Sequence, residues 1–79
     1  MRLDKYLKVS RLIKRRTIAN EACDSARVMV NGREAKASYQ VKLGDVIEIA
    51  FGNRSLRVEV TDLSDNAKKN EAATMYREL

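Results

Sequence analysis

Lysine and arginine side chains gather at the amino end of the chain, where their spacing suits phosphate binding. Residues 1–16 hold seven bases against one acid, Asp4. Arginine grips a phosphate with a planar pair of hydrogen bonds, and lysine adds a point charge. Like charges repel one another unless a polyanion meets them. The cluster therefore favours nucleic acid over a membrane surface, because the segment lacks a broad apolar face with Trp or Phe.

Composition argues against most catalytic chemistry. The 79 residues carry a net charge of +5, with one Cys and no His. Zinc sites of the Cys/His type, disulfide frameworks and imidazole triads are excluded. A G-x-x-x-x-G-K-[ST] phosphate loop does not occur. Cys23 is predicted to be a buried small hydrophobe. We expect a protein that is not an enzyme and needs no metal or cofactor.

The length and the apolar pattern predict one small domain. The apolar runs of the chain are too short to span a membrane, and its start lacks the apolar core of a signal peptide. A lone Cys suits a reducing cytosol. These features predict a cytoplasmic protein, which we expect to be a monomer when it is free.

Helical spacing dominates the first third of the chain. Residues 4–10 are predicted to form a short helix, with Asp4 as its N-cap or in its first turn. Thr17 is expected to cap a second helix that runs to about Ala26. The apolar stripe of the second helix is expected to hold Ile18, Ala22 and Ala26, with Ala19 and Cys23 beside them.

Alternating residues and turn signals then predict a small antiparallel sheet. Asn31-Gly32 is a strong turn signal, because both residues tolerate positive φ. Helical spacing returns in residues 67–79, which are expected to form a tail helix. The fold class is therefore α+β, with two N-terminal helices packed on the sheet and a short helical tail. The predicted strands and their turns are Val28–Val30, 42–45, Val46–Phe51, 52–55 and Leu56–Val60.

The predicted helices would present one continuous cationic surface. Few aromatic residues are available to stack unpaired bases, so recognition of folded RNA by its backbone and shape is favoured. DNA is the weaker choice, because the second helix offers little basic or amide character for base edges. The cationic surface, with the hydroxyl that follows it, consists of Lys5, Lys8, Arg11, Lys14, Arg15, Arg16 and Thr17.

Several short motifs follow one another in a characteristic order and spacing over residues 1–60. The motifs are Arg2-Leu3-Asp4-Lys5-x-Leu7, Arg16-Thr17-x-Ala19, Arg27-Val28-x-Val30-Asn31-Gly32, Lys36-x-Ser38 and Val41-Lys42-x-Gly44-Asp45-x-Ile47. This ordered set resembles the RNA-binding domain of small-subunit ribosomal protein S-four, in its stand-alone form, the heat-shock-protein-fifteen family. Ala26 departs from the pattern, because the family usually has Gly at this position, and Ala37 stands where close relatives often have Pro.

The resemblance implies an RNA-binding domain over residues 1–62, followed by a tail over residues 63–79. It implies a factor of ribosome-associated quality control that binds large ribosomal subunits holding a peptidyl-tRNA. The implied partners are large-subunit ribosomal RNA, the P-site tRNA and an RqcH-like tailing factor. The implied RNA contacts add Arg2 to the cationic surface, with Asp4, Asn31 and Lys36 as second-tier or positioning residues.

A protein-interaction module of the ubiquitin-like type is the alternative from another class. Short strands around a Gly44-Asp45 turn also occur in such folds. Carrier chemistry is excluded, because it needs a C-terminal Gly-Gly and this chain ends in Arg77-Glu78-Leu79.

Overall fold

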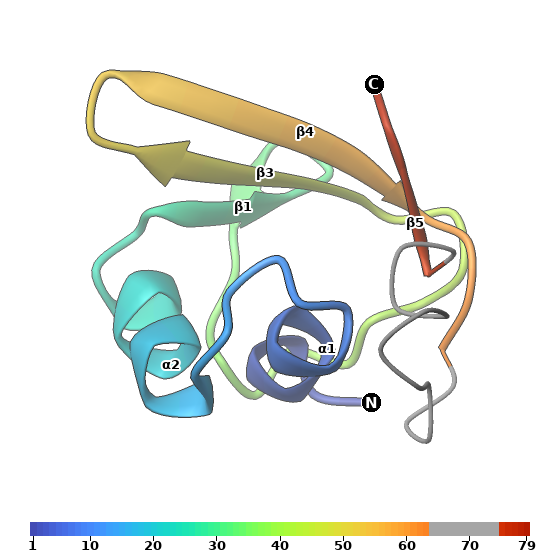
Figure 1. The fold of residues 1–79 in the computed structure, drawn as a ribbon, viewed down its shortest axis with the longest axis horizontal. Coiled ribbons are helices and arrows are strands. Elements are labelled where there is room, and N and C mark those ends of the chain that lie inside the picture. The colour runs from blue at the N-terminus through green and yellow to red at the C-terminus, as the bar shows by residue number, and fades with distance from the viewer. Residues whose placement is uncertain (64–74) are drawn as a thin grey trace.

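The computed structural model describes residues 1–63 and 75–79, which form two helices beneath one antiparallel sheet (Figure 1). The sheet has the strand order β2-β1-β3-β4-β5. The predicted α+β class, with two N-terminal helices packed on an antiparallel sheet, is confirmed. The elements are α1 (Leu3–Val9), α2 (Arg16–Asp24), β1 (Val28–Val30), β2 (Arg33–Glu34), β3 (Val46–Phe51), β4 (Arg54–Val60) and β5 (Tyr76–Glu78).

Helix α1 begins at Leu3 without a side-chain cap, and Asp4 lies in its first turn, which is one of the two places predicted for it. Backbone carbonyls from a distant loop take the place of a cap. The N–H of Leu3 donates to the carbonyl of Tyr39 at 2.8 Å, and the N–H of Asp4 donates to that of Ala37 at 3.2 Å. Tertiary contacts therefore satisfy the unpaired donors of the first helical turn.

Helix α2 begins two residues earlier than the sequence predicts, because its N-cap is Arg15 and not Thr17. Arg15 is the N-cap in extended conformation, and it makes no side-chain cap hydrogen bond, so Thr17 lies inside the helix. The buried side of α2 carries Ala19, Ala22 and Cys23, whose small side chains let α1 approach closely. Ile18 is 48% exposed. The expectation that it lies on the buried stripe is wrong, because α1 covers the Ala19 side of the helix.

The end of α2 adopts a left-handed conformation at Ala26, which has a φ of 61°. The N–H of Ala26 donates to the carbonyl of Cys23, and the N–H of Arg27 donates to that of Ala22. This pair of bonds is a Schellman motif, in which glycine normally occupies the left-handed position. Ala26 is strained there, which agrees with its place in the sequence motifs, where the family usually has Gly.

The sheet is built around the β3–β4 hairpin, whose register pairs Ile47 with Val58 and Phe51 with Arg54. Strand β4 starts earlier than predicted, so the turn has only two residues between the strands. The core lies between the sheet and the helices. It is formed by fully buried residues that include Leu3, Tyr6 and Leu7 from α1 and Val28, Ile47, Ile49, Val58 and Val60 from the sheet.

The C-terminal residues form strand β5, so the helical tail expected there is wrong for Tyr76–Glu78. These residues pair with β4, with Val60 opposite Tyr76 and Val58 opposite Glu78. The buried Met75 before them accepts hydrogen bonds at its carbonyl from the Tyr6 hydroxyl at 2.6 Å and from two backbone N–H groups. Sheet pairing and this anchor outweigh a weak local helical preference. The remaining part of the predicted tail helix, residues 67–74, lies outside the described residues.

None of the helices found in residues 1–63 and 75–79 has the length and apolar character needed to cross a lipid bilayer.

We predict that Ala26→Gly stabilises the protein. A left-handed φ costs a residue with a side chain about 1–2 kcal/mol, part of which the greater freedom of glycine in the unfolded chain offsets. The free energy of unfolding should rise by about 1 kcal/mol, and the melting temperature by roughly 4–8 °C. Ala22→Gly, in the helical interior of α2, is the matched control and should destabilise. Unchanged or lower stability of Ala26→Gly in urea denaturation would contradict this account.

Candidate RNA-binding site

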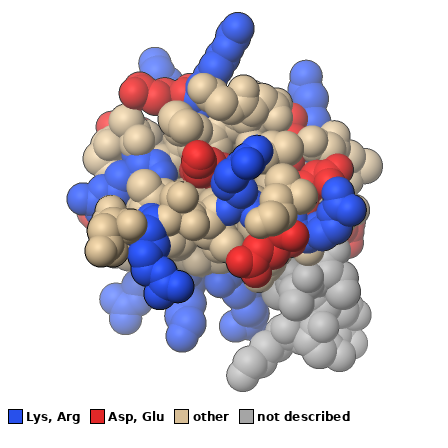
Figure 2. Space-filling model, turned by 90° about the horizontal axis from the view of Figure 1, so that it is seen from above, with Lys and Arg blue, Asp and Glu red and all other residues tan. Residues whose placement is uncertain are grey.

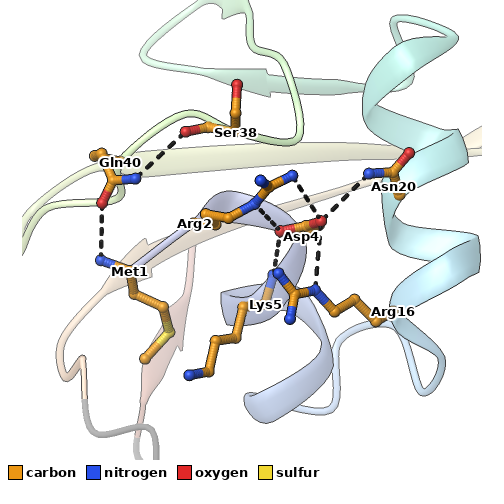
Figure 3. A network of polar contacts seen from close by, with 8 residues as sticks. All are labelled: Met1, Arg2, Asp4, Lys5, Arg16, Asn20, Ser38 and Gln40. Carbon is orange, nitrogen blue, oxygen red and sulfur yellow. Dashed lines mark hydrogen bonds and ion pairs between the residues drawn. The ribbon is translucent and has the colours of Figure 1, made fainter.

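A buried carboxylate organises the amino-terminal cations. The side chain of Asp4 is only 3% exposed. It accepts hydrogen bonds from Arg2 Nε at 3.1 Å and Arg2 Nη2 at 3.3 Å, and from the amide of Asn20 at 3.3 Å. Arg16 Nε lies 3.4 Å from its second oxygen. Figure 3 shows these side chains converging on Asp4 from the start of α1 and from α2. We call Asp4, Arg2, Arg16 and Asn20 the Asp4 cluster.

Asp4 is ionised at neutral pH. Its burial by itself raises the pKa of the carboxyl group, but hydrogen bonds from Arg2, Asn20, Arg16 and the N–H of Lys5 favour the charged form and lower the pKa overall. The carboxylate therefore remains a permanent acceptor that fixes both guanidinium groups.

The two arginines are held in place but keep exposed donors. The side chains of Arg2 and Arg16 are 45% and 49% exposed. Each guanidinium has five N–H donors, and Asp4 engages only part of them. Two positive charges also share one negative charge, so the Asp4 cluster remains cationic. It offers oriented N–H groups of the kind that bind a phosphate oxygen.

Loop 35–41 fixes the start of α1, where Arg2 lies. Besides the two carbonyls that cap α1, the N–H of Val41 donates to the carbonyl of Met1 at 2.9 Å. The amino group of Met1 lies 3.3 Å from Gln40 Oε1 (Figure 3). Arg2 and Gln40 form an isolated antiparallel bridge. Loop 35–41 therefore fixes the backbone at Met1 and at Leu3, the residues on either side of Arg2.

The other predicted cations extend from the Asp4 cluster along α1 and the connection to α2. Lys5 is half-buried, and Lys8 lies exposed one turn later on α1. Arg11, Lys14 and Arg15 are exposed in the connection, and Arg11 has a left-handed φ of 63°. Within the described part of the chain, no hydrogen bond or ion pair engages the side chains of Lys8, Arg11, Lys14 and Arg15.

The two predicted second-tier residues that remain lie elsewhere. The side chain of Asn31 is committed to the fold, because it donates to the buried Asp45 at 3.1 Å and accepts from the N–H of Val46 at 3.0 Å. Its geometry is that of a structural residue. Lys36 is exposed and lines a separate hollow beside Asp24 and Glu34. The structure therefore does not bring either residue into the Asp4 cluster.

Sequence reasoning missed Asn20 and Glu21. Asn20 is one helical turn from Arg16, a spacing that places both side chains on one face of α2. Glu21 has the same relation to Thr17. Asp4, Arg16, Thr17, Asn20 and Glu21 together line a hollow at the α1–α2 junction. The sequence shows the four-residue spacing on α2, but it does not show that Asp4 of α1 faces these residues.

The outer face of the sheet has a different electrostatic character. Viewed from the sheet side, basic and acidic side chains are interspersed (Figure 2). The register places Glu48 opposite Arg57, and Arg77 forms an ion pair with Glu59. Charges of opposite sign are thus paired across the strands, and this face lacks the one-sided charge of the α1 region.

Comparisons with known proteins show the family and the fold of this chain. The S4 domain model matches residues 1–47. The chain is 57% identical to the RQC P-site tRNA stabilizing factors of Bacillus subtilis and Streptococcus pneumoniae, over 96% of its own length and 88% and 86% of theirs. Its fold is similar to the trimeric structure of Vibrio cholerae Heat Shock Protein 15, with a TM-score of 0.91 and 32% identity, covering all of this chain and 81% of that one.

We predict that Asp4→Asn lowers stability and its dependence on acid. A lowered pKa in the folded state means that Asp4 contributes stability above the unfolded pKa of about 3.9, which is lost as pH falls through the folded value. The variant should lose about 1–3 kcal/mol at pH 7, because it weakens hydrogen bonds to a charged acceptor.

Urea denaturation of both proteins at pH 7 and pH 3 tests this prediction. Asp4→Asn should lose less stability between the two pH values than the wild type does. Asp45 contributes the same acid-dependent loss to both, because its pKa is also lowered. Asp24→Asn, at an exposed acid of α2, is the control and should behave as the wild type. Equal acid dependence of Asp4→Asn and wild type would contradict the prediction.

Proposed function

Because the chain belongs to the S4 domain family and, within it, to the RQC P-site tRNA stabilizing factors, we propose that it binds P-site tRNA during ribosome-associated quality control. It acts by binding and not by catalysis. In the finer form of the proposal, it binds the large ribosomal subunit through ribosomal RNA and the P-site tRNA, and it supports C-terminal tailing of stalled nascent chains beside an RqcH-like factor.

One observation carries this proposal: two arginines from different elements share one buried carboxylate and keep exposed donors. A guanidinium fixed before binding loses less side-chain entropy when it meets a phosphate. Arg2, Asp4 and Arg16 also stand in the motifs that match the family pattern. The same positions thus carry the fold contact and the proposed RNA contact.

The remaining cations extend the contact along a backbone. Lys8, Arg11, Lys14 and Arg15 are exposed around α1 and the connection to α2. Phosphates recur along a nucleic acid strand, so several cations engage it without reading its sequence. This arrangement supports recognition by backbone and shape.

The alternative of a ubiquitin-like interaction module has less support. The match to the S4 domain covers the whole cationic surface, and the similarity to Heat Shock Protein 15 extends over the full chain. Among the described residues, the exposed cations of α1 and of its connection to α2 favour RNA over a protein partner.

We predict that Arg16→Ala weakens binding to large subunits while the protein stays folded. Loss of one oriented guanidinium should lower affinity about tenfold, which corresponds to about 1.4 kcal/mol. Stability should change little, since Arg16 is half-exposed and Asp4 keeps its other donors. Sucrose-gradient sedimentation of tagged protein, with and without stalled peptidyl-tRNA, measures the effect. Arg54→Ala, at an exposed cation of β4, is the matched control. Equal co-sedimentation of Arg16→Ala and wild type would remove Arg16 from the site.

We also predict a salt-sensitive complex. If about four to six phosphates are neutralised, the logarithm of affinity should fall against the logarithm of salt concentration with a slope of roughly −3 to −5. Arg16→Ala should make the slope shallower by about one. Titration of fluorescent RNA at several salt concentrations measures both values. A slope near zero would contradict RNA contact through phosphates.

A further inference from the structure

The hollow beside the Asp4 cluster contains more acceptors than a phosphate site can use. It has about 410 Å³ of space, within the range of small-ligand sites. Its lining pairs residues one turn apart on α2, Arg16 with Asn20 and Thr17 with Glu21, and Asp4 faces them from α1. Only Arg16 in this set is a cation. Glu21 is an exposed acid within an otherwise cationic surface.

The orientation of Asn20 adds an acceptor to the carboxylate of Glu21. The amide nitrogen of Asn20 donates to Asp4, so its oxygen is directed away from that carboxylate (Figure 3). Within the described residues, no hydrogen bond engages the Asn20 oxygen or the Glu21 carboxylate. A phosphate has no donor for either group, and the charge of Glu21 repels it. These groups are suited to a ligand that brings N–H donors.

Nucleobases bring such donors. Adenine and cytosine carry an exocyclic amino group, and carboxylates and amide oxygens accept from such groups in protein–nucleic acid complexes. Uracil offers a single N–H between two carbonyl oxygens, which a carboxylate repels. The guanidinium of Arg16 also provides a flat surface on which a base can stack.

We propose that this hollow receives one unpaired nucleobase with an exocyclic amino group, which donates to Glu21 and Asn20 while the surrounding cations hold the backbone. This inference rests on the proposed RNA binding and gives it a sequence preference. RNA contact at this site is then not only electrostatic.

The substitution of Glu21 separates this proposal from a purely electrostatic site. If Glu21 only repels phosphate, Glu21→Ala binds every RNA more tightly than the wild type. If Glu21 accepts from a base, Glu21→Ala loses affinity for the favoured RNA. Asp24→Ala is the matched control, because Asp24 is an exposed acid one turn along α2 and outside the lining of the hollow.

The probes are fluorescent RNA hairpins with one common stem and loops made only of uridine, only of cytidine or only of adenosine. Anisotropy titration of the wild type should give about fivefold or tighter binding to a cytidine or adenosine loop than to the uridine loop. Glu21→Ala should lose affinity for the favoured loop and most of this preference, because only the Asn20 oxygen remains to accept from the base amino group. Asp24→Ala should keep the preference.

A further hairpin, with 2′-deoxyribose in the favoured loop, distinguishes the base from the ribose 2′-hydroxyl as the donor. Retained preference supports the base, and a lost preference overturns the proposal. Equal binding of all loops by the wild type, or tighter binding of all loops by Glu21→Ala, also overturns it while the proposed RNA binding stands. If no hairpin binds at low salt, the proposed RNA binding itself is contradicted.

Discussion

A buried negative charge needs donors on every side, and Asp4 obtains them from separate parts of the chain. Without them, the cost of removing the carboxylate from water would exceed what the surrounding apolar contacts return. Arg2 approaches from the residue before α1, the N–H of Lys5 from α1 itself, and Arg16 and Asn20 from α2. The requirement that fixes the helix pair therefore also aims the guanidinium groups outward. The contacts that stabilise the fold at Asp4 therefore also set the geometry of the cationic surface.

A second buried carboxylate connects this surface to the sheet. Asp45 accepts from the Tyr39 hydroxyl at 2.8 Å, from the N–H of Lys42 at 2.9 Å and from Asn31. Burial alone raises the pKa of Asp45, but these donors lower it overall. The hydrogen bond that the Tyr39 hydroxyl donates to Asp45 raises the pKa of Tyr39. Tyr39 in turn caps α1 with its carbonyl. Tyr39 thus links the start of β3 to the start of α1, next to Arg2.

Local signals in the sequence were sufficient for much of the fold and for the position of the cations in the candidate site. Period changes located both helices and the β3–β4 hairpin, and the charge imbalance located the cations. Where the structure differs from these predictions, contacts with distant parts of the chain outweigh the local preference. Pairing with β4 makes Tyr76–Glu78 a strand, and the packing of α2 leaves Ile18 exposed. Carbonyls of loop 35–41 cap α1, and Asp4 lies in its first turn. The involvement of Asn20 needed the facing position on α1, which periodicity alone does not provide.

The left-handed backbone at Arg11 implies a trade-off between durability and charge. Glycine would relax this position, as it would at Ala26, but only at Arg11 would the exchange also remove a cation from the proposed RNA surface. Selection for heat resistance alone should therefore favour glycine at both positions, whereas selection that includes RNA binding should accept it at 26 and reject it at 11. Comparing the substitutions recovered under the two regimes would separate residues kept for folding from those kept for their charge.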